Sequence, residues 1–307
     1  MSDRITPPNF QESDKLFTEL FEEVQKWESP LSTRSTQLSK GAAAVQDLMQ
    51  SKVSFGNPSD KLILLTEEIF KDVGVELNSI YRRQMRETHD FYYMTVTVDL
   101  RPKPGAKFWR LSCQMDFSPK GEKEPIVQTI FPESKWQSLM SFGVGMNLAL
   151  NENLEWNVGV DTSAFAELVK IPDIKASIST KNELKAFVVV PDYPYEAGAF
   201  EIIAQGSGSS ECFWRIEESD IQKMTTVKFA IVFKVPKDSE SITLRGVVWA
   251  EANMDWLFAT VRDAFSEMGE RFKSLFRNKG EEINKLSRGD EKEWVLTLPK
   301  GGTSESP

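Results

Sequence analysis

The first quarter of the chain carries apolar residues at every third or fourth position, with acidic residues on the opposite face. That spacing is typical of amphipathic helices. Asn57 followed by Pro58 adds a start signal, because an Asn side chain caps a helix and Pro suits its first turn. We therefore predict a helical N-terminal region over residues 1–88. Its helices are expected after a capping Ser13 up to Trp27, over 37–52, from Asn57 through 70, and over 76–88.

Beyond this region, apolar and polar side chains begin to alternate. Met94 and Val96 alternate with Thr95 and Thr97, which is the period of two expected for a half-buried strand. Similar short segments follow at close intervals, separated by Gly, Pro and Asn turns. Helix-length gaps are too few for βαβ units, so we predict an antiparallel β-sandwich-like core over 89–251. The predicted strands are 90–100, 108–117, 125–131, 139–150, 155–160, 174–179, 184–190, 199–205, 211–217, 226–235 and 241–250.

A helical pattern returns over 252–288, where apolar residues form one stripe from Trp256 to Phe276. Its acidic residues come first and its basic residues last, as the helix dipole favours. We predict a C-terminal amphipathic helix here, and then a mostly flexible tail over 289–307 in which Trp294–Leu298 forms a short edge strand. The predicted fold class is therefore α+β, with an antiparallel β-sandwich-like core between an N-terminal helical segment and a C-terminal amphipathic helix.

Composition and charge narrow the function classes. The 307 residues include 20 Phe and 8 Trp, which we interpret mainly as packing between two sheets. The net charge is −9, and an acidic protein repels phosphate backbones, so we predict no nucleic-acid binding. The N-terminus lacks the apolar stretch of a signal peptide, and no segment has the length and apolar character of a membrane-spanning helix. We therefore expect a cytoplasmic protein.

Candidate catalytic residues are few. His89 is the single histidine, which excludes zinc sites built on several histidines. Cys113 and Cys212 lie far apart in apolar strands, and we expect both to be buried and reduced. A Cys–His dyad is a weaker alternative without a local signature. Gly206–Ser–Gly208 lacks the lysine and helix of a phosphate loop, so we predict a hairpin loop there. We predict no cofactor, no metal site and no catalytic residue.

The basic second half of the C-terminal helix is the best candidate for a contact surface. Its apolar residues lie beside lysines and arginines, which suits anionic lipid or a groove in a partner. Simple packing on the core is the competing interpretation. We predict a non-catalytic binding protein (an adaptor, regulator or effector) that acts through contacts with a protein partner. The candidate contact residues are Phe272, Lys273, Leu275, Phe276, Arg277 and Lys279.

A membrane-acting or pore-forming effector is the alternative function, and a hydrolase without a sequence signature is the third. The pore-forming alternative would use strand-rich segments such as 139–160. We interpret no part of that segment as an alternating hairpin long enough to span a membrane, which weighs against it. No family motif is matched, so no functional residue is carried over from known proteins.

Overall fold

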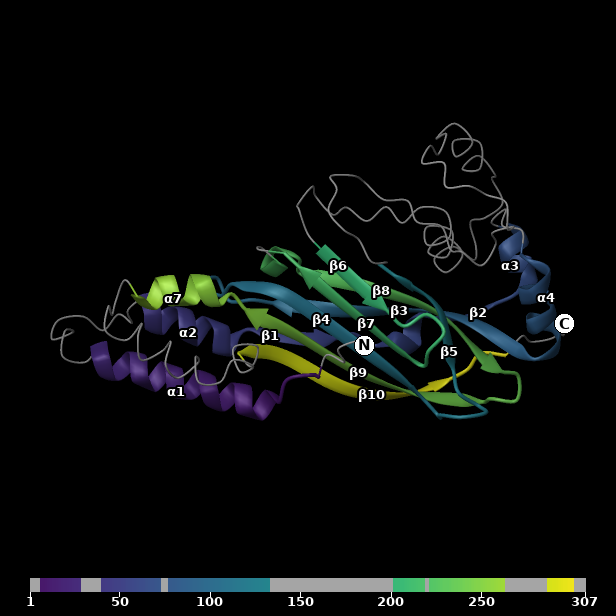
Figure 1. The fold of residues 1–307 in the computed structure, drawn as a ribbon, viewed down its shortest axis with the longest axis horizontal. Coiled ribbons are helices and arrows are strands. Elements are labelled where there is room, and N and C mark those ends of the chain that lie inside the picture. The colour runs from purple at the N-terminus through teal and green to yellow at the C-terminus, as the bar shows by residue number, and fades with distance from the viewer. Residues whose placement is uncertain are drawn as a thin grey trace, which may run out of the picture.

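The computed structural model describes residues 6–28, 40–72, 77–132, 201–218, 221–262 and 286–300. Within these ranges two antiparallel sheets pack together, and helices lie at both ends of the pair (Figure 1). The predicted fold class is confirmed at this level, as an α+β protein with a sandwich-like core. The predicted C-terminal amphipathic helix over 252–288 is not shown. A helix, α7, covers Met254–Arg262, residues 263–285 lie outside the described residues, and the predicted helix end at 287–288 belongs to a strand instead.

The first sheet is built around one long central strand. Its five strands are β1 (Lys52–Phe55), β2 (Leu62–Leu65), β3 (His89–Arg101), β5 (Ile126–Phe131) and β8 (Thr226–Pro236). β3 pairs with β8 along most of its length, with Met94 opposite Ile231. β1 and β2 pair with β3, and β5 pairs with β8. β5 is therefore an edge strand among the described residues.

The second sheet has the order β10-β9-β4-β7-β6. These strands are β4 (Phe108–Ser118), β6 (Glu201–Gln205), β7 (Glu211–Glu217), β9 (Ser241–Ala252) and β10 (Ser287–Thr297). In the centre, Cys113 of β4 lies opposite Trp214 of β7 and Val248 of β9. β6 and β10 form the two edges of this sheet as far as the described residues show.

Alternation along the strands fills the space between the sheets with large apolar side chains. The rings of Phe117 and Phe233 lie 4.8 Å apart, and so do those of Trp214 and Phe229. All four side chains are fully buried. Burying an apolar side chain of this size contributes roughly 1.5–3 kcal/mol. The interpretation of the aromatic residues as core packing is confirmed for these residues.

Helices α1, α2 and α7 gather at one end of the sandwich, on the left of Figure 1. α1 spans Phe10–Glu28 and α2 spans Lys40–Gln50. Phe17 and Val24 of α1, Leu48 of α2 and Leu257 of α7 are buried in the same cluster as the interior of the sandwich. The helices therefore extend the core beyond the ends of the strands.

Two short helices, α3 (Glu67–Asp72) and α4 (Ser79–Glu87), lie at the opposite end. They cover a second apolar cluster that includes Phe70 of α3 together with Phe91 and Tyr93 of β3. The inward-facing neighbours on β3 belong to the main core instead. The first sheet therefore buries apolar side chains on both of its faces at this end.

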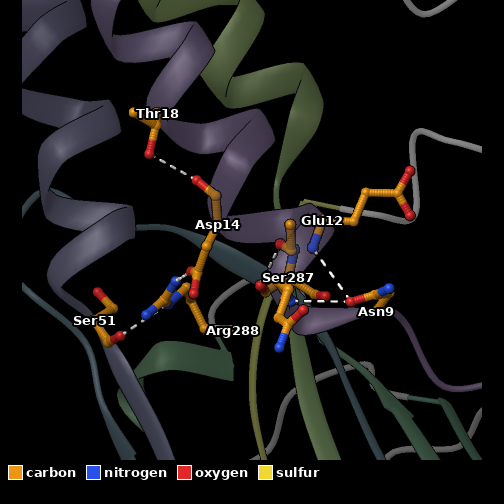
Figure 2. A network of polar contacts seen from close by, with 9 residues as sticks. Asn9, Glu12, Asp14, Thr18, Ser51, Ser287 and Arg288 are labelled. Carbon is orange, nitrogen blue, oxygen red and sulfur yellow. Dashed lines mark hydrogen bonds and ion pairs between the residues drawn. The ribbon is translucent and has the colours of Figure 1, made fainter.

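A polar network ties α1 to the edge of the second sheet (Figure 2). Arg288 of β10 forms an ion pair with Asp14 of α1, and its Nε donates to the carbonyl of Ser51 behind α2 at 3.3 Å. Ser13 Oγ donates to the carbonyl of Ser287 at 2.7 Å and accepts a hydrogen bond from its amide at 3.0 Å. These contacts fix the helix against the strand.

The predicted start of α1 is wrong by four residues. Ser13, the predicted cap, lies inside the helix and contacts β10, whereas Asn9 takes the capping role. The Oδ1 of Asn9 accepts hydrogen bonds from the amides of Gln11 and Glu12 at 3.1 and 3.3 Å. An Asn side chain in this position satisfies amides of the first turn that have no partner within the helix.

Two further predictions are corrected. Residues 62–65 form β2 on the flank of β3, not the predicted helix. Asn57 does cap a helical turn, but the turn is the short 3-10 segment η1 (Pro58–Lys61).

The predicted flexible tail over 289–307 is wrong up to Thr297, because β10 pairs with β9 along its whole length. The predicted strands between 139 and 190 lie outside the described residues.

Side chains of β10 in the second sheet also form hydrogen bonds with the backbone of β1 in the first sheet. The amide of Phe55 in β1 donates to the carboxylate of Asp290 at 3.0 Å. The ammonium of Lys292 donates to the carbonyl of Phe55 at 3.0 Å, and Lys292 pairs with Asp290 at 3.4 Å. Both backbone groups of Phe55 are therefore occupied.

Candidate functional site

The described contacts of His89, Cys113 and Cys212 include no Cys–His pair. His89 begins β3 at the end of the first sheet, with its Nδ1 2.7 Å from Thr88 Oγ1. Cys113 and Cys212 face the interior from the second sheet, and both are free and buried. The predicted burial of both thiols is confirmed.

The protonation of these groups also argues against a dyad. Burial raises the pKa of Cys113 well above its usual value, and the neighbouring Cys212 adds to the shift. The pKa of Cys212 is raised by burial and by the charge of Asp116. Desolvation, with Lys234 nearby, lowers the pKa of His89. Neither thiol is therefore favoured to form the thiolate that acts as a nucleophile.

The predicted contact residues of the C-terminal helix lie outside the described residues, which stop at Arg262 and resume at Leu286. These are Phe272, Lys273, Leu275, Phe276, Arg277 and Lys279. Within α7, Leu257 is buried, and Trp256 and Phe258 pack against the core. Contact with a protein partner through 272–279 stays a prediction.

Neither a metal site nor a spanning helix is found in the described part of the chain. No group of three or more His, Cys, Asp or Glu side chains there could hold a metal ion. No helix in those ranges is long and apolar enough to cross a membrane.

The structure does bring distant segments together where the two sheets meet at β5. We refer to β5, the turn over 206–210 and the side chains of Asp116, Lys120 and Glu124 as the seam. The amide of Val127 in β5 donates to the carbonyl of Ser209 at 2.9 Å, and the amide of Gly208 donates to the carbonyl of Val127 at 2.8 Å. The turn that joins β6 to β7 is therefore bonded to the edge of the other sheet.

A network of ion pairs and hydrogen bonds around Lys120 connects the parts of the seam. Lys120 Nζ donates to Asp116 Oδ1 at 2.6 Å and to Ser210 Oγ at 2.5 Å, and Ser210 Oγ donates to a carboxylate oxygen of Glu124. Glu124 and Glu211 lie 3.8 and 3.9 Å from Lys120 Nζ. A Ser–Lys pair can support nucleophilic catalysis when the lysine accepts the hydroxyl proton. Here Lys120 is an ammonium donor among carboxylates, so the arrangement favours a structural role.

The seam also depends on two glycines of the predicted hairpin loop, which the structure confirms. Gly206 and Gly208 have φ angles of +138° and +84°, a region that side-chain-bearing residues rarely adopt. A Cβ on Gly206 would lie 2.5 Å from the Cα of Cys212. The turn therefore needs glycine at position 206 for two independent reasons.

A second polar cluster lies on the outer face of the second sheet. Arg110 of β4 bridges Glu217 of β7 at 2.9 Å and Glu251 of β9 at 3.2 Å. Its guanidinium stacks 3.8 Å above the ring of Trp109, and the indole of Trp249 donates to Glu251 at 3.2 Å. Each charged group contacts an opposite charge, so the cluster fastens three adjacent strands together.

The sequence between β5 and β6 alternates regularly in polarity. From Met140 to Leu150, every even position is a large apolar residue and every odd position is Ser, Gly, Asn or Ala. From Asn153 to Asp161, the even positions are again apolar and the odd positions are Asn, Glu, Gly or Asp. The interpretation that no long alternating hairpin exists here is therefore wrong at the level of sequence. The apolar residues are Met140, Phe142, Val144, Met146, Leu148, Leu150, Leu154, Trp156, Val158 and Val160.

Comparison with known proteins does not assign a family. No family model matches the chain, and no curated protein matches it. Among solved structures, a protein described as pore-forming is 6% identical with a TM-score of 0.29, covering 65% of this chain and 78% of its own. The Clostridium perfringens NetB toxin in its membrane-inserted form is 9% identical with a TM-score of 0.24, covering 53% and 76%.

A third solved structure, the Clostridium perfringens delta-toxin, is 9% identical with a TM-score of 0.23, covering 66% of this chain and 78% of its own. These TM-scores are below 0.5, so the three likenesses establish neither a shared family nor a function.

Proposed function

We propose that this protein acts on membranes by inserting a β-hairpin made of residues 140–161, and that several copies together form a pore. The observation that carries the proposal is the double alternation in the sequence between Met140 and Asp161. Strands that cross a membrane in pores alternate apolar residues toward lipid with polar residues toward water. The seam supports the proposal, because it holds the strands from which this segment departs.

The turn between the two runs has the length that a hairpin requires. With Asn151–Asn153 as a three-residue turn, Leu150 lies opposite Leu154 and Leu148 opposite Trp156. Each further pair joins two even positions or two odd positions, because side chains alternate with a period of two. All the apolar residues therefore share one face of the hairpin. A shift by one residue would place apolar opposite polar along its whole length.

The first run has the length that a membrane-crossing strand needs. A strand needs about 9–11 residues to cross the hydrocarbon layer when it is tilted. The first run covers 140–150, whereas the second covers 154–161 after the turn and is one residue shorter than this minimum. Charged residues in these runs, Glu155 and Asp161, fall on the polar face, where water would line the pore.

The proposed hairpin segment lies between two edge strands of the described sheets. β5 ends at Phe131 and β6 begins at Glu201. Among the described residues, β5 pairs only with β8 and β6 only with β7. No ladder that the structure describes therefore includes residues 140–161.

The test compares one charge placed on each face of the proposed hairpin. Val158→Lys puts the charge on the lipid face near mid-membrane, at a cost of about 2–4 kcal/mol. Asn157→Lys puts the same side chain on the water face, one position away. We expect the wild type and Asn157→Lys to release dye from lipid vesicles, and Val158→Lys to release little.

Circular dichroism of both variants before vesicles are added controls for unfolding. The proposal would be rejected if the wild-type chain released no dye from neutral or anionic vesicles. Equal leakage from the two lysine variants would also reject it, because a hairpin with a lipid face must distinguish them.

A further inference from the structure

Helix α4 lies at the end of the molecule opposite α1, α2 and α7 (Figure 1). One face of this helix is fixed on the first sheet. Tyr81 and Met85 pack against the second apolar cluster, and the ring of Tyr81 meets that of Phe91 edge-on at 5.9 Å. Arg86 holds α4 to α3 through a bidentate pair with Glu67, at 2.7 and 2.9 Å. The orientation of α4 is therefore well defined.

The other face of α4 presents an apolar residue to solvent. Ile80 is 53% exposed, one of two large apolar side chains exposed among the described residues. Its backbone amide donates to the cap Asn78 at 2.6 Å, so the first turn is held in place. Arg83 follows three positions later and is also exposed, which places it on the same face as Ile80.

The charge of this helix differs from that of the whole chain. α4 contains Arg82, Arg83 and Arg86 against Glu87, a net charge of +2 from three bases and one acid, which the pair of Arg86 with Glu67 of α3 reduces to +1. The whole chain has a net charge of −9. An exposed apolar residue among arginines suits a surface that offers both phosphate and hydrocarbon.

The other exposed apolar residue provides a contrast within the same molecule. Val295 of β10 is 69% exposed, more than Ile80. The preceding exposed residues of its strand include Glu291 and Glu293. An anionic surface would repel these carboxylates, so exposure alone does not make Val295 a comparable contact.

We propose that the face of α4 carrying Ile80 and Arg83 docks the protein on the surface of an anionic phospholipid membrane. This deepens the proposed function, on which it rests for the kind of partner. Ile80 would enter the boundary between headgroups and acyl chains, and Arg83 would bind lipid phosphate. Docking through α4 would hold the chain at the membrane before any hairpin inserts.

The experiment measures cosedimentation of the full chain with vesicles of phosphatidylcholine alone and of phosphatidylcholine and phosphatidylserine in equal parts. We expect binding to the anionic vesicles, and weaker binding at high salt. One basic residue near such a surface accounts for about a fivefold change in partitioning. Arg83→Gln should lower binding by about that factor, and Ile80→Asp by more. Val295→Asp is the matched control and should bind as the wild type does.

Thermal unfolding of each variant shows whether it is folded, and the exposure of Ile80 and Val295 makes both changes compatible with folding. The proposal fails if the wild type does not bind anionic vesicles, or if Ile80→Asp binds as well as Val295→Asp. The hairpin variant Val158→Lys should still bind anionic vesicles although it releases little dye, because its change lies outside α4. Binding without leakage in the wild type would reject the hairpin and leave docking intact, whereas leakage that Ile80→Asp does not reduce would reject docking alone.

Discussion

Glu251 is the carboxylate that the described fold most clearly holds away from water. It lies between Arg110 and Trp249 on the outer face of the second sheet. Its pKa is raised from 4.5, because desolvation outweighs the attraction of Arg110 and Arg215 and the hydrogen bond from Trp249. In the unfolded chain this shift disappears, so folding favours the protonated form of Glu251.

The sign of this shift predicts a pH dependence of stability. The contribution of Glu251 is fully present below its unfolded pKa of 4.5 and is lost as the pH rises through the higher folded value. Glu251→Gln removes that titration. Urea unfolding at a series of pH values should therefore show the wild type losing stability relative to the variant as the pH rises through this window. A difference that stayed constant with pH would contradict the assignment.

The β6–β7 turn shows how one element depends on local backbone geometry. Gly206 combines a positive φ with close approach to Cys212, whereas Gly208 has a positive φ and open space around its Cα. The two positions therefore separate backbone strain from steric conflict within one turn.

An alanine at each position tests this difference. Gly208→Ala should lower the free energy of unfolding by about 1–2 kcal/mol, the cost of a left-handed conformation for a residue with a Cβ. Gly206→Ala should cost more, because its Cβ also meets the backbone of β7. Denaturant unfolding of the two variants measures both values. Equal effects would mean that the contact with Cys212 relaxes freely.

Most strands could be predicted from the sequence because one of their faces is buried. Met94 and Val96 alternate with threonines, and the structure places this segment in β3. Leu62–Leu65 is apolar throughout, so periodicity could not separate strand from helix. The seam was beyond prediction, because Lys120 and Ser210 are 90 positions apart.

At the scale of the whole molecule, the sandwich has different ends. Three helices continue the core at one end, while α3 and α4 cover the outer face of a sheet at the other (Figure 1). The two proposals use different parts of this body, α4 for docking and the chain between β5 and β6 for insertion. A pore then requires more than one molecule, because a lone hairpin in hydrocarbon has unpaired backbone groups along both edges.

Assembly can therefore be measured directly. Dye release should rise more steeply than in proportion to the amount of bound protein, because several copies must meet before a pore closes. Chemical crosslinking on anionic vesicles should give a ladder of multimers, and crosslinking without vesicles should give mainly the single chain. Release strictly proportional to bound protein, with no multimers, would contradict a pore built from several copies.

The contacts of Asp290 and Lys292 with Phe55 protect part of β1 from pairing with another chain. An edge strand with free amides and carbonyls is a template on which another chain can add a strand. At the end of β1 both groups of Phe55 are already occupied by the two side chains. A second copy would have to displace a carboxylate and an ammonium before it could pair there. At Phe55 this flank therefore offers no free backbone group on which another chain could add a strand.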